Sequence, residues 1–441
     1  MLYEAIFKLI YRKANSLDKL NELLNNEKLT QEEIKILQIQ KINNLIQHAY
    51  SNCNYYADLF DKKGIKPKIS SFKDFQNLPI LTKTNLKENL SGLKARNYSD
   101  RDLLKMGTGG STGIPTHFYQ DKRFLEYVHA HKVRNLLWTG WQPGEWDFRL
   151  WGSAFDVKKS KKIKSQLLYL LLRWKVYPAF EISESLILKF VEDIKKYKPS
   201  VIQGYTMPLV IVAKYLSEHK ISFGYIPRAV INCAETLYDP AREVIERGFR
   251  TKVFNRYGGR ELGDISHECN FGNMHINQDL VYVEIVDDQG NLVDDGQMGH
   301  ILLTGLENYG MPFIRYKVED MGVFKRGEES CRCGLNSKII DRVLGRSQDI
   351  IKLSRGKYLA GEFFPHLFKD FDVEKFQVIQ EEIDLITIKF VKGPNISDAD
   401  IRYLKNKIDK YVQEAKVVFE FVEDIPTSPS GKFRFTISNI K

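Results

Sequence analysis

The ten residues Gly107-Thr108-Gly109-Gly110-Ser111-Thr112-Gly113-Ile114-Pro115-Thr116 have the composition of an anion-binding loop. Glycines let backbone N–H groups approach an anion closely and adopt positive φ, and hydroxyl side chains add hydrogen-bond donors. The stretch lacks the Gly-Lys-Ser/Thr ending of a P-loop, and the chain contains no Gly-x-Gly-x-x-Gly dinucleotide pattern. It therefore predicts a nucleotide-phosphate site of another kind. The motifs that follow it in the sequence indicate which class of nucleotide site this is.

Composition describes an ordinary globular chain with an excess of positive charge. The 441 residues include 66 basic and 56 acidic side chains, which gives a net charge of +10, and 43% of the residues are hydrophobic. The positive excess suits phosphate-bearing substrates, nucleic acid or an anionic membrane surface. Because the lysines are scattered and no nucleic-acid module signature appears, we expect no nucleic-acid partner.

The sequence favours a cytoplasmic location. The N-terminal residues form a charged helical pattern without a cleavage site, and no apolar run reaches the length of a membrane span. Five cysteines, an odd number in a long chain, argue against a disulfide framework. A location at the inner membrane surface stays open.

Hydrophobic patterns predict an α/β fold in two parts. The first part, 1–345, begins with a helical segment over 1–95 and continues with strands that alternate with helices, which indicates βαβ units and a largely parallel sheet, followed by antiparallel strands. The second part, 346–441, reads as a small α+β unit, and Asp341–Gly345 reads as the hinge. The fold class is thus a large N-terminal domain of mixed sheets flanked by helices, plus a small C-terminal domain.

Two motifs follow predicted strands. Ala234-Glu235-Thr236 stands where open α/β sheets bind ligands, at the carboxyl end of a strand. Arg256-Tyr257-Gly258-Gly259-Arg260-Glu261 supplies a tyrosine that can stack on a base and a carboxylate that can hold Mg²⁺. Taken singly, each is also compatible with an ordinary helix cap or turn.

Three more candidates lie downstream. Met311–Gly322 places Asp320 after an apolar stretch, where a carboxylate can accept both ribose hydroxyls. Arg346 adds a cation beside the hinge. Lys432, in Ser430-Gly431-Lys432, can reach a distant phosphate as a mobile point charge, although a lone lysine of this kind is usually just solvated.

Together, and in this order, these motifs closely resemble the adenylate-forming superfamily of acyl-CoA synthetases, adenylation domains and luciferases. Within it the chain is most similar to the phenylacetate–CoA ligase branch and to that branch's capsular polysaccharide biosynthesis (CapK-type) members. Further stretches match the same branch: Leu45-Ile46-Gln47-His48-Ala49-Tyr50, Tyr55-Tyr56, Leu78-Pro79-Ile80-Leu81-Thr82-Lys83, Trp151-Gly152 and Gln203-Gly204-Tyr205.

The resemblance implies an ATP- and Mg²⁺-dependent ligase that makes an acyl adenylate, releases pyrophosphate and then transfers the acyl group. The residues implied to bind the nucleotide are Thr108, Gly109, Gly110, Ser111, Thr112 and Gly113 at the phosphates, Glu235 beside the adenine, Tyr257 stacked on it, Asp320 and Arg346 at the ribose, and Glu261 at Mg²⁺. Lys432 is implied to be the catalytic lysine, assisted by Glu261. The C-terminal domain is implied to be a mobile lid that rotates and removes Lys432 after the first half-reaction.

One position departs from the family pattern. The usual hinge carboxylate stands three residues after the glycine of Gly345-Arg346, where this chain has Gln348, followed by Asp349. Either Asp349 replaces that carboxylate or the hinge pivots differently.

A separate group of cysteines and histidines predicts a structural Zn²⁺ site. The expected ligands are Cys269, His275, Cys331 and Cys333, with His267 as the reserve imidazole. Several proteins of the phenylacetate–CoA ligase type are similar here, and four protein ligands leave no open position for a catalytic water. The alternative is a set of metal-free reduced thiols, which is what we expect of Cys53 and Cys233.

The substrates are less well defined. We expect a small-molecule carboxylic acid whose pocket is drawn from 130–155, 203–208 and 233–236. We expect acyl transfer in polysaccharide or capsule modification, to an amine or hydroxyl on a glycan. The alternative is coenzyme A as the acceptor, as for a ligase of an aryl or short-chain acid. A homodimer stays open.

A function of another class is a membrane-peripheral scaffold without catalysis. Lysines at 158–164 precede a leucine-rich helix at 167–175, and such a pair can lie on an anionic leaflet. The plainer interpretation, which we favour, is a charged loop before a buried helix.

Overall fold

The structure is a computed structural model of the chain. The residues it describes are 2–107, 116–151, 163–179, 182–327, 331–346, 350–353, 357–360, 363–368, 371–412, 415–426 and 433–440.

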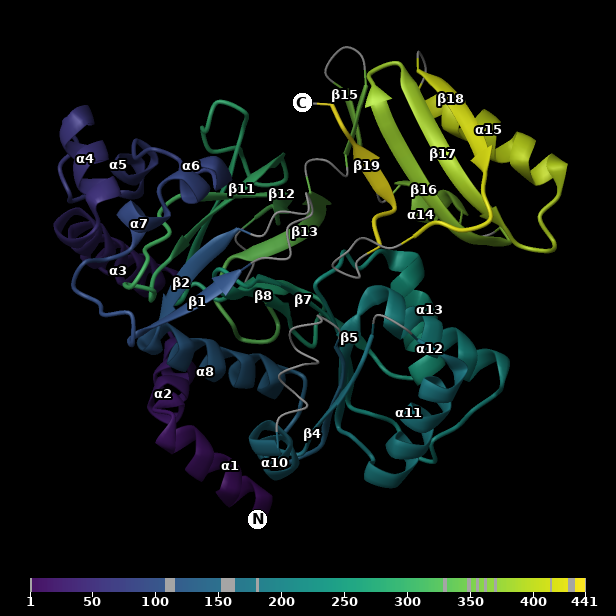
Figure 1. Cartoon of the computed structure of the whole chain (residues 1–441), viewed down its shortest axis with the longest axis horizontal. Helices are drawn as coiled ribbons and strands as arrows, with labels where there is room; N and C mark the ends of the chain where they lie inside the picture. Colours follow the sequence, from purple (N-terminus) through teal and green to yellow (C-terminus); the bar gives the residue numbers. More distant parts are fainter. Residues whose placement is uncertain are drawn as a thin grey trace.

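One large mixed sheet organises the first three quarters of the chain (Figure 1). Eleven strands of the described residues lie side by side in the order β10-β11-β12-β13-β9-β8-β7-β6-β5-β3-β4. Neighbours from β4 to β7 are parallel, and those from β7 to β10 are antiparallel. The strands are β3 (Asp147–Leu150), β4 (Trp174–Tyr177), β5 (Val201–Tyr205), β6 (Ala229–Cys233), β7 (Val253–Gly259), β8 (Gly263–Glu268), β9 (Met274–Ile276), β10 (Val281–Val286), β11 (Met298–Gly305), β12 (Tyr316–Phe324) and β13 (Ile339–Arg346). The predicted α/β class with mixed sheets is confirmed.

Helices cover both faces of the parallel half. One face buries its aliphatic side chains against α11 (Glu184–Tyr197), α12 (Thr206–Glu218) and α13 (Asp239–Phe249). The opposite face packs on α8 (Lys122–Trp138) and on α1 (Leu2–Lys13) and α2 (Ser16–Asn26). Both faces are covered because parallel strands bury both of their sides, and β5 and β6 are buried at every position.

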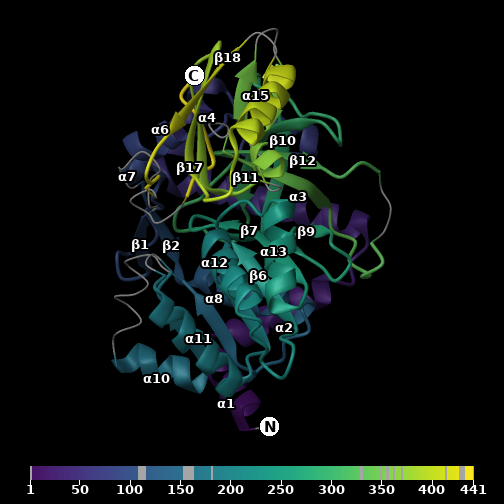
Figure 2. The ribbon, with the colours of Figure 1, turned by 90° about the vertical axis from the view of Figure 1, so that its right-hand side faces the viewer.

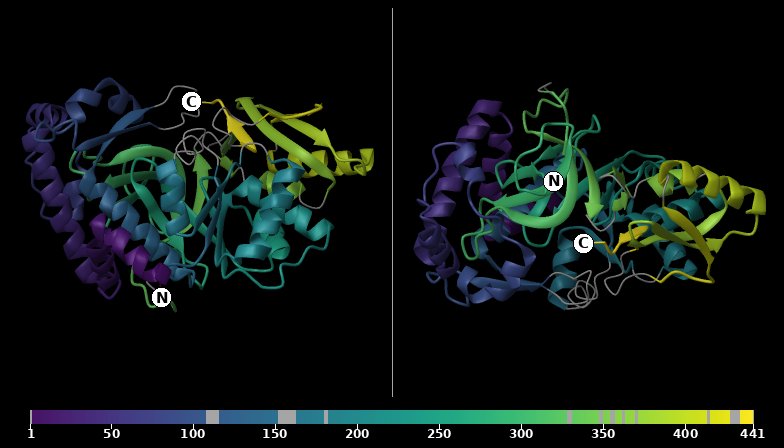
Figure 3. Two further views of the ribbon diagram at one scale, coloured as in Figure 1. Left: turned by 60° about the horizontal axis from the view of Figure 1, so that its bottom comes forward. Right: turned by 90° about the horizontal axis from the view of Figure 1, so that it is seen from above.

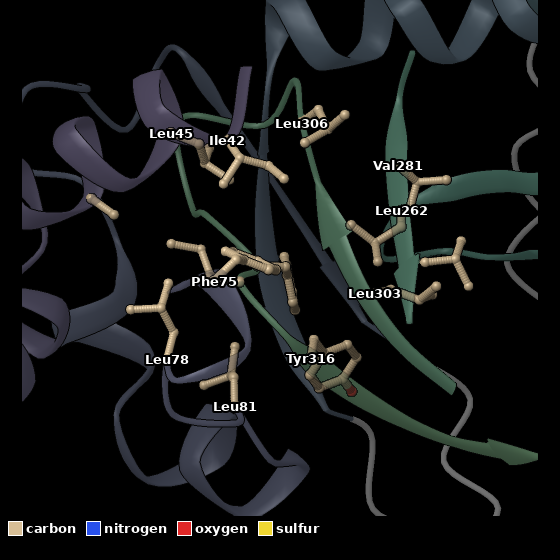
Figure 4. Close-up of a cluster of buried hydrophobic side chains, with 14 of the residues drawn as sticks. Ile42, Leu45, Phe75, Leu78, Leu81, Leu262, Val281, Leu303, Leu306 and Tyr316 are labelled. Atoms are coloured by element: carbon tan, nitrogen blue, oxygen red, sulfur yellow. The ribbon is translucent and has the colours of Figure 1, made fainter. Parts of the chain in front are cut away.

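The N-terminal helices cover the antiparallel half. Their apolar side chains meet those of β10, β11 and β12 in one buried cluster, part of which is drawn in Figure 4. Ile42 and Leu45 come from the long helix and Phe75 from a short one, and they lie across from Leu303 and Tyr316 of the sheet. Burial of each such side chain contributes roughly 1.5–3 kcal/mol. The helices are α3 (Gln31–Asn52), α4 (Asn54–Lys63), α5 (Phe72–Gln76), α6 (Lys83–Glu88) and α7 (Leu90–Leu93).

The last quarter of the chain forms a separate small unit (Figures 1 and 3). A four-stranded sheet, in the order β18-β17-β16-β19, buries its own apolar cluster under α15. The elements are β14 (Ile350–Leu353), β15 (Lys357–Ala360), α14 (Phe363–Phe368), β16 (Val373–Glu382), β17 (Leu385–Lys392), α15 (Asp398–Val412), β18 (Lys416–Phe421) and β19 (Thr436–Ser438). In the side view of Figure 2 this unit lies at the end of the molecule opposite the N-terminus.

The segment 341–345, predicted as the hinge, is part of strand β13. Its backbone pairs with β12 through most of its length, and the start of the strand pairs with β9. The prediction missed this because the pairing of a strand with its partners, here β12 and the more distant β9, is not visible in the sequence of the segment itself. Gln348 and Asp349, the two candidate hinge residues, lie outside the described residues.

A buried ion pair fastens the N-terminal helices to the sheet. Arg315 and Glu284 are 2% and 1% exposed, and the Arg315 Nη2 atom lies 3.0 Å from Glu284 Oε1. The same guanidinium donates to the carbonyl oxygens of Gln76 and Leu78. Burial raises the pKa of Glu284, and Arg315 opposes that rise. One side chain thus joins the connection between α5 and α6 to β10.

We predict that Arg315→Met lowers the free energy of unfolding by about 3–5 kcal/mol, because it leaves the Glu284 carboxylate buried without its cation. Denaturant unfolding of the purified variant measures the loss. The double variant Arg315→Met/Glu284→Met recovers much of it, and Lys8→Met, which removes the exposed pair with Glu4, changes the unfolding midpoint little. An equally small effect for Arg315→Met would contradict this view of the pair.

Candidate active site

Glu235 follows β6 at the carboxyl edge of the parallel strands. The chain turns sharply there, because Ala234 adopts a φ of 69°, a region that residues with a side chain rarely occupy. Glu235 Oε2 accepts a hydrogen bond of 3.1 Å from the backbone N–H of Met207, at the start of α12. Asn232 donates to the Glu235 carbonyl oxygen at 3.2 Å and holds the turn. The carboxylate therefore has a fixed place between the ends of β5 and β6.

Tyr257 and Asp320 are brought together from strands far apart in the sequence. The Tyr257 hydroxyl donates to Asp320 Oδ2 at 2.7 Å. Asp320 is also the register partner of Arg346, across the ladder between β12 and β13. The hydrogen bond and the strand pairing thus place three of the four residues predicted for adenine and ribose next to one another, while the Arg346 side chain is outside the described atoms.

Glu261 lies in the turn of the β7–β8 hairpin, beside the ends of the Gly-rich stretch. The turn is held by Gln120, which donates to the carbonyl oxygen of Arg260 at 2.7 Å. Arg260 in turn donates to the carbonyl oxygen of Gly107 at 3.2 Å. The residues predicted to hold the phosphates, Thr108–Gly113, lie outside the described residues.

The two ends of that stretch are nevertheless placed. β1 (Leu103–Gly107) and β2 (His117–Asp121) pair as an antiparallel two-stranded sheet, and Gly107 is the register partner of His117. The end of this strand pair nearest the Gly-rich stretch therefore meets the turn that carries Glu261.

Asp121 fixes this hairpin to the rest of the molecule. It is 1% exposed, and its carboxylate accepts from three backbone N–H groups: Phe124 at 2.7 Å, Tyr309 at 2.7 Å and Gly310 at 2.8 Å. The first bond caps α8. A Cβ atom at Gly310 would come within 2.3 Å of Leu103 Cδ2 and 3.1 Å of Asp121 Cβ, so a larger residue there would displace the Leu103 side chain. The sequence prediction missed Asp121, although an Asp directly before a helix is an N-cap signal.

Lys432 lies outside the described residues, but the chain after it is placed. Phe435 packs edge-on to Tyr238, with ring centroids 6.1 Å apart. Tyr238 stands three residues after Glu235, so the small C-terminal unit meets the large sheet close to the edge described above.

A second group of side chains lies on the other side of the hairpin β7–β8. The ligand atoms of Cys269, His275, Cys331 and Cys333 are all within 4.8 Å of one another. The Sγ atoms of Cys269 and Cys331 are 3.7 Å apart, and Cys333 Sγ lies 3.2 Å from His275 Nε2. These are the four residues that the sequence predicted to converge.

Neighbouring side chains orient this group. Ser337 Oγ lies 3.0 Å from His275 Nδ1, and Asn273 donates to Cys331 Sγ at 3.1 Å. His267, the reserve imidazole, is the register partner of His275 but stands outside the group, with its Nδ1 2.8 Å from the Glu268 carbonyl oxygen. Burial lowers the pKa of His267 to about 4, so its ring is neutral at pH 7.

Comparisons with known proteins agree with this arrangement. Residues 351–439 match the model of the CapK C-terminal domain family. Protein CapK of Staphylococcus aureus is 27% identical over 421 residues, which cover 92% of this chain and 89% of that protein. The phenylacetate-coenzyme A ligase of Thermus thermophilus is 25% identical over 343 residues, covering 74% and 73% of the two chains.

Solved structures share the fold. The 2-hydroxyisobutyryl-CoA ligase in its postadenylation state superposes with a TM-score of 0.76 at 17% identity, over 94% of this chain and 91% of that one. Against the same ligase in its thioesterification state the TM-score is 0.63, at 19% identity and the same coverage. The chain is therefore similar in sequence to CapK and to phenylacetate-coenzyme A ligases, and it shares its fold with an adenylate-forming CoA ligase.

Proposed function

We propose that the protein activates a carboxylic acid with ATP, as an acyl adenylate, and then transfers the acyl group to an acceptor. The observation that carries this proposal is the meeting of Tyr257 with Asp320 at the edge where Glu235 and Glu261 also lie. A base-stacking ring, a ribose-binding carboxylate and a metal-binding carboxylate are the groups that a bound nucleotide needs, and these come from separate strands.

The proposed roles follow the position of each residue. Tyr257 and Glu235 bind the adenine, and Asp320 and Arg346 bind the ribose. Thr108–Gly113 hold the phosphates from the hairpin connection. Glu261 and the phosphate oxygens hold Mg²⁺, which prefers one or two carboxylates together with phosphate. The ion supplies positive charge that offsets the phosphates.

In the first half-reaction a carboxylate oxygen attacks the α-phosphorus, the bond from that phosphorus to the bridging oxygen breaks, and pyrophosphate leaves. Two anions have to meet, so the protein has to offer cations and N–H donors rather than a nucleophile. We propose that Lys432 bridges the carboxylate and the α-phosphate. The residues 346–441 would form the lid that carries Lys432, and 1–345 the adenylation core.

In the second half-reaction a thiol, amine or hydroxyl attacks the acyl carbon, and AMP leaves. Coenzyme A is the acceptor we favour, because the structurally similar 2-hydroxyisobutyryl-CoA ligase is known with an acyl-AMP and with CoA. A glycan-linked amine or hydroxyl, in capsule or polysaccharide modification, is the alternative, and its support is the similarity to CapK.

We predict that Lys432→Ala lowers the rate of adenylation by about 100- to 1,000-fold without unfolding the protein, because one charged contact to the transition state is lost. ATP–pyrophosphate exchange and trapping of the acyl adenylate with hydroxylamine, across a panel of acids, measure the rate. Lys405→Ala, at an exposed position of α15, is the matched control. Unchanged exchange in Lys432→Ala would remove that lysine from the mechanism, and no exchange with any acid in the unmodified protein would remove the proposed function.

We also propose that Cys269, His275, Cys331 and Cys333 hold a structural Zn²⁺ ion. Two thiolates bound at about 2.3 Å in a tetrahedral site lie about 3.8 Å apart, close to the 3.7 Å between Cys269 and Cys331. The contact of His275 with Ser337 fixes the ring orientation, as outer partners of metal-bound histidines do. All four positions are filled by protein, so the ion would fasten the structure and take no part in the reaction.

For this site we predict that elemental analysis finds about one zinc per chain, and that Cys331→Ser loses the zinc and melts at a lower temperature. His267→Asn, next to the group but outside it, keeps the metal. Zinc-free protein with the same melting temperature, or loss of zinc from His267→Asn alone, would refute the assignment.

We also propose contact with a membrane surface, and the exposure of leucines on one helix supports it. Three leucines of α10 (Ile163–Leu171) are largely exposed: Leu167 at 58%, Leu168 at 39% and Leu170 at 58%. α1 packs beside this helix, exposes Leu2 and Leu9, and ends in Arg12 and Lys13. Both helices lie at the end of the molecule that carries the N-terminus (Figures 1 and 2).

Exposed leucines flanked by cations fit an anionic lipid surface. No helix in the described part of the chain has the length and apolar character needed to cross a membrane, and all five cysteines are free. We therefore propose a cytoplasmic enzyme that touches the membrane from that side. A scaffold without catalysis is the alternative, and the exchange assay described above separates the two.

We predict that the protein co-sediments with phosphatidylglycerol vesicles and not with phosphatidylcholine vesicles, and that Leu167→Ser/Leu170→Ser abolishes the binding while the melting temperature is kept. Ile226→Ser, at another exposed apolar residue, is the control. Equal sedimentation with and without anionic vesicles would rule out this contact.

A further inference from the structure

A buried polar cluster lies under α8, on the face of the parallel strands that is otherwise apolar. Gln203 of β5 donates its amide to both oxygens of Asp147 of β3, at 2.9 and 2.8 Å. Its carbonyl oxygen accepts from Arg256 Nη1 of β7 at 3.1 Å. The Arg256 Nε atom lies 3.8 Å from Asp264 Oδ1 of β8. Four strands thus contribute to one chain of polar contacts.

This cluster adjoins the proposed nucleotide site. Arg256 directly precedes Tyr257, and its register partner Cys233 ends β6 just before the turn that carries Glu235. Because β5, β6 and β7 are parallel, their carboxyl ends share one edge, where open α/β sheets bind ligands. A carboxylate that reacts with the α-phosphate of a nucleotide bound by Tyr257 would have the rest of its molecule near Arg256.

Among these four side chains Arg256 and Asp264 keep the most exposure, 12% and 9%, whereas Gln203 is 3% exposed and Asp147 is fully buried. Arg256 is the cation of that pair, and it lies in β7 directly before Tyr257. Trp151 stands next to Arg256, with the guanidinium carbon 5.7 Å from the ring centroid. The amide of Gln203 is fixed by Asp147, so its carbonyl oxygen can only face Arg256. The cluster therefore presents an oriented guanidinium, with Gln203 and Asp147 behind it.

The chemistry of this group restricts what can lie against it. A guanidinium carries five N–H donors, and an aryl or alkyl group placed over them would exclude water without replacing its hydrogen bonds. Hydroxyl and carbonyl oxygens accept from such donors. The positive charge of Arg256 would repel an ammonium group on the substrate. Asp264 already balances that charge, so the substrate needs no second carboxylate to do so.

We infer that Arg256 is a specificity-determining residue, and that the acid activated by this protein carries hydroxyl or carbonyl oxygens next to its carboxylate-bearing end. Hydroxy acids and sugar acids belong to this class, and unsubstituted aryl or alkyl acids do not. The inference rests on the proposed function, since it names the substrate class of the same site. Gln203 acts through Arg256 and is a positioning residue.

The test compares matched acids in the ATP–pyrophosphate exchange assay. One pair is a uronic acid and cyclohexanecarboxylate, and the other is 2-hydroxyisobutyrate and pivalate. Phenylacetate and alanine are included as acids outside the proposed class. The expected result is at least about a tenfold higher kcat/KM for the oxygen-bearing member of one pair, because a site built to hydrogen-bond rejects analogues that lack the partner. Arg256→Leu brings this ratio close to one, and Arg256→Lys retains part of it. Gln203→Leu also lowers this ratio of kcat/KM values. If Gln203 served only to pack the core, its replacement would leave the ratio unchanged.

Two controls keep the outcomes separate. Arg228→Leu removes an arginine at the opposite, amino-terminal end of β6, paired with Glu145, and leaves the ratio unchanged. Should Arg256→Leu not fold, Arg256→Lys and Gln203→Leu still report the ratio. Preference for phenylacetate or an alkyl acid, or a ratio that Arg256 variants do not alter, would overturn the inference while the proposed function stands. No exchange with any acid would instead overturn the proposed function itself.

Discussion

Three backbone N–H groups converge on the carboxylate of Asp121, and much of the candidate site depends on that convergence. The side chain ends β2, caps α8 and holds the chain at Tyr309 and Gly310. It therefore fixes the hairpin that carries the Gly-rich stretch, the helix that covers the sheet and the turn that leads to Asp320. A buried carboxylate is tolerated here because each acceptor position is used by a donor that is itself part of the fold.

Local patterns predicted local structure well. The strands and helices that alternate in the middle of the chain, and the antiparallel strands that follow them, were predicted, and the structure has both. Their apolar residues repeat within one element, so the signal is complete within the segment. The hairpin β1–β2 and strand β13 were missed, and 341–345 was wrongly assigned to a hinge, because each is defined by its pairing with another strand and not by an apolar repeat within its own segment.

The site shows the same division. Tyr257, Glu235 and Asp320 could be named from motif order, and Cys269, His275, Cys331 and Cys333 from their residue types. The structure joins Tyr257 to Asp320 and brings together the four ligand atoms of the Cys/His group. Asp264 gave no comparable signal, and the helix-cap signal of Asp121 and the family match of Gln203 did not reveal their contacts, because these form between segments that the sequence separates. A sequence motif can identify a residue that contacts a ligand. The polar side chains that hold such a residue in place can be identified only from the contacts in the folded structure.

Strand β13 also decides when the large sheet can form during synthesis. It is the last of the eleven described strands to be made, yet it lies between β9 and β12. A nascent chain that has not yet exposed residue 339 therefore holds two separate sheets with open edges, β10-β11-β12 and β9 to β4. Open edges invite pairing with other chains. The edges of β9 and β12 have no partner strand in the chain itself until β13 has been made.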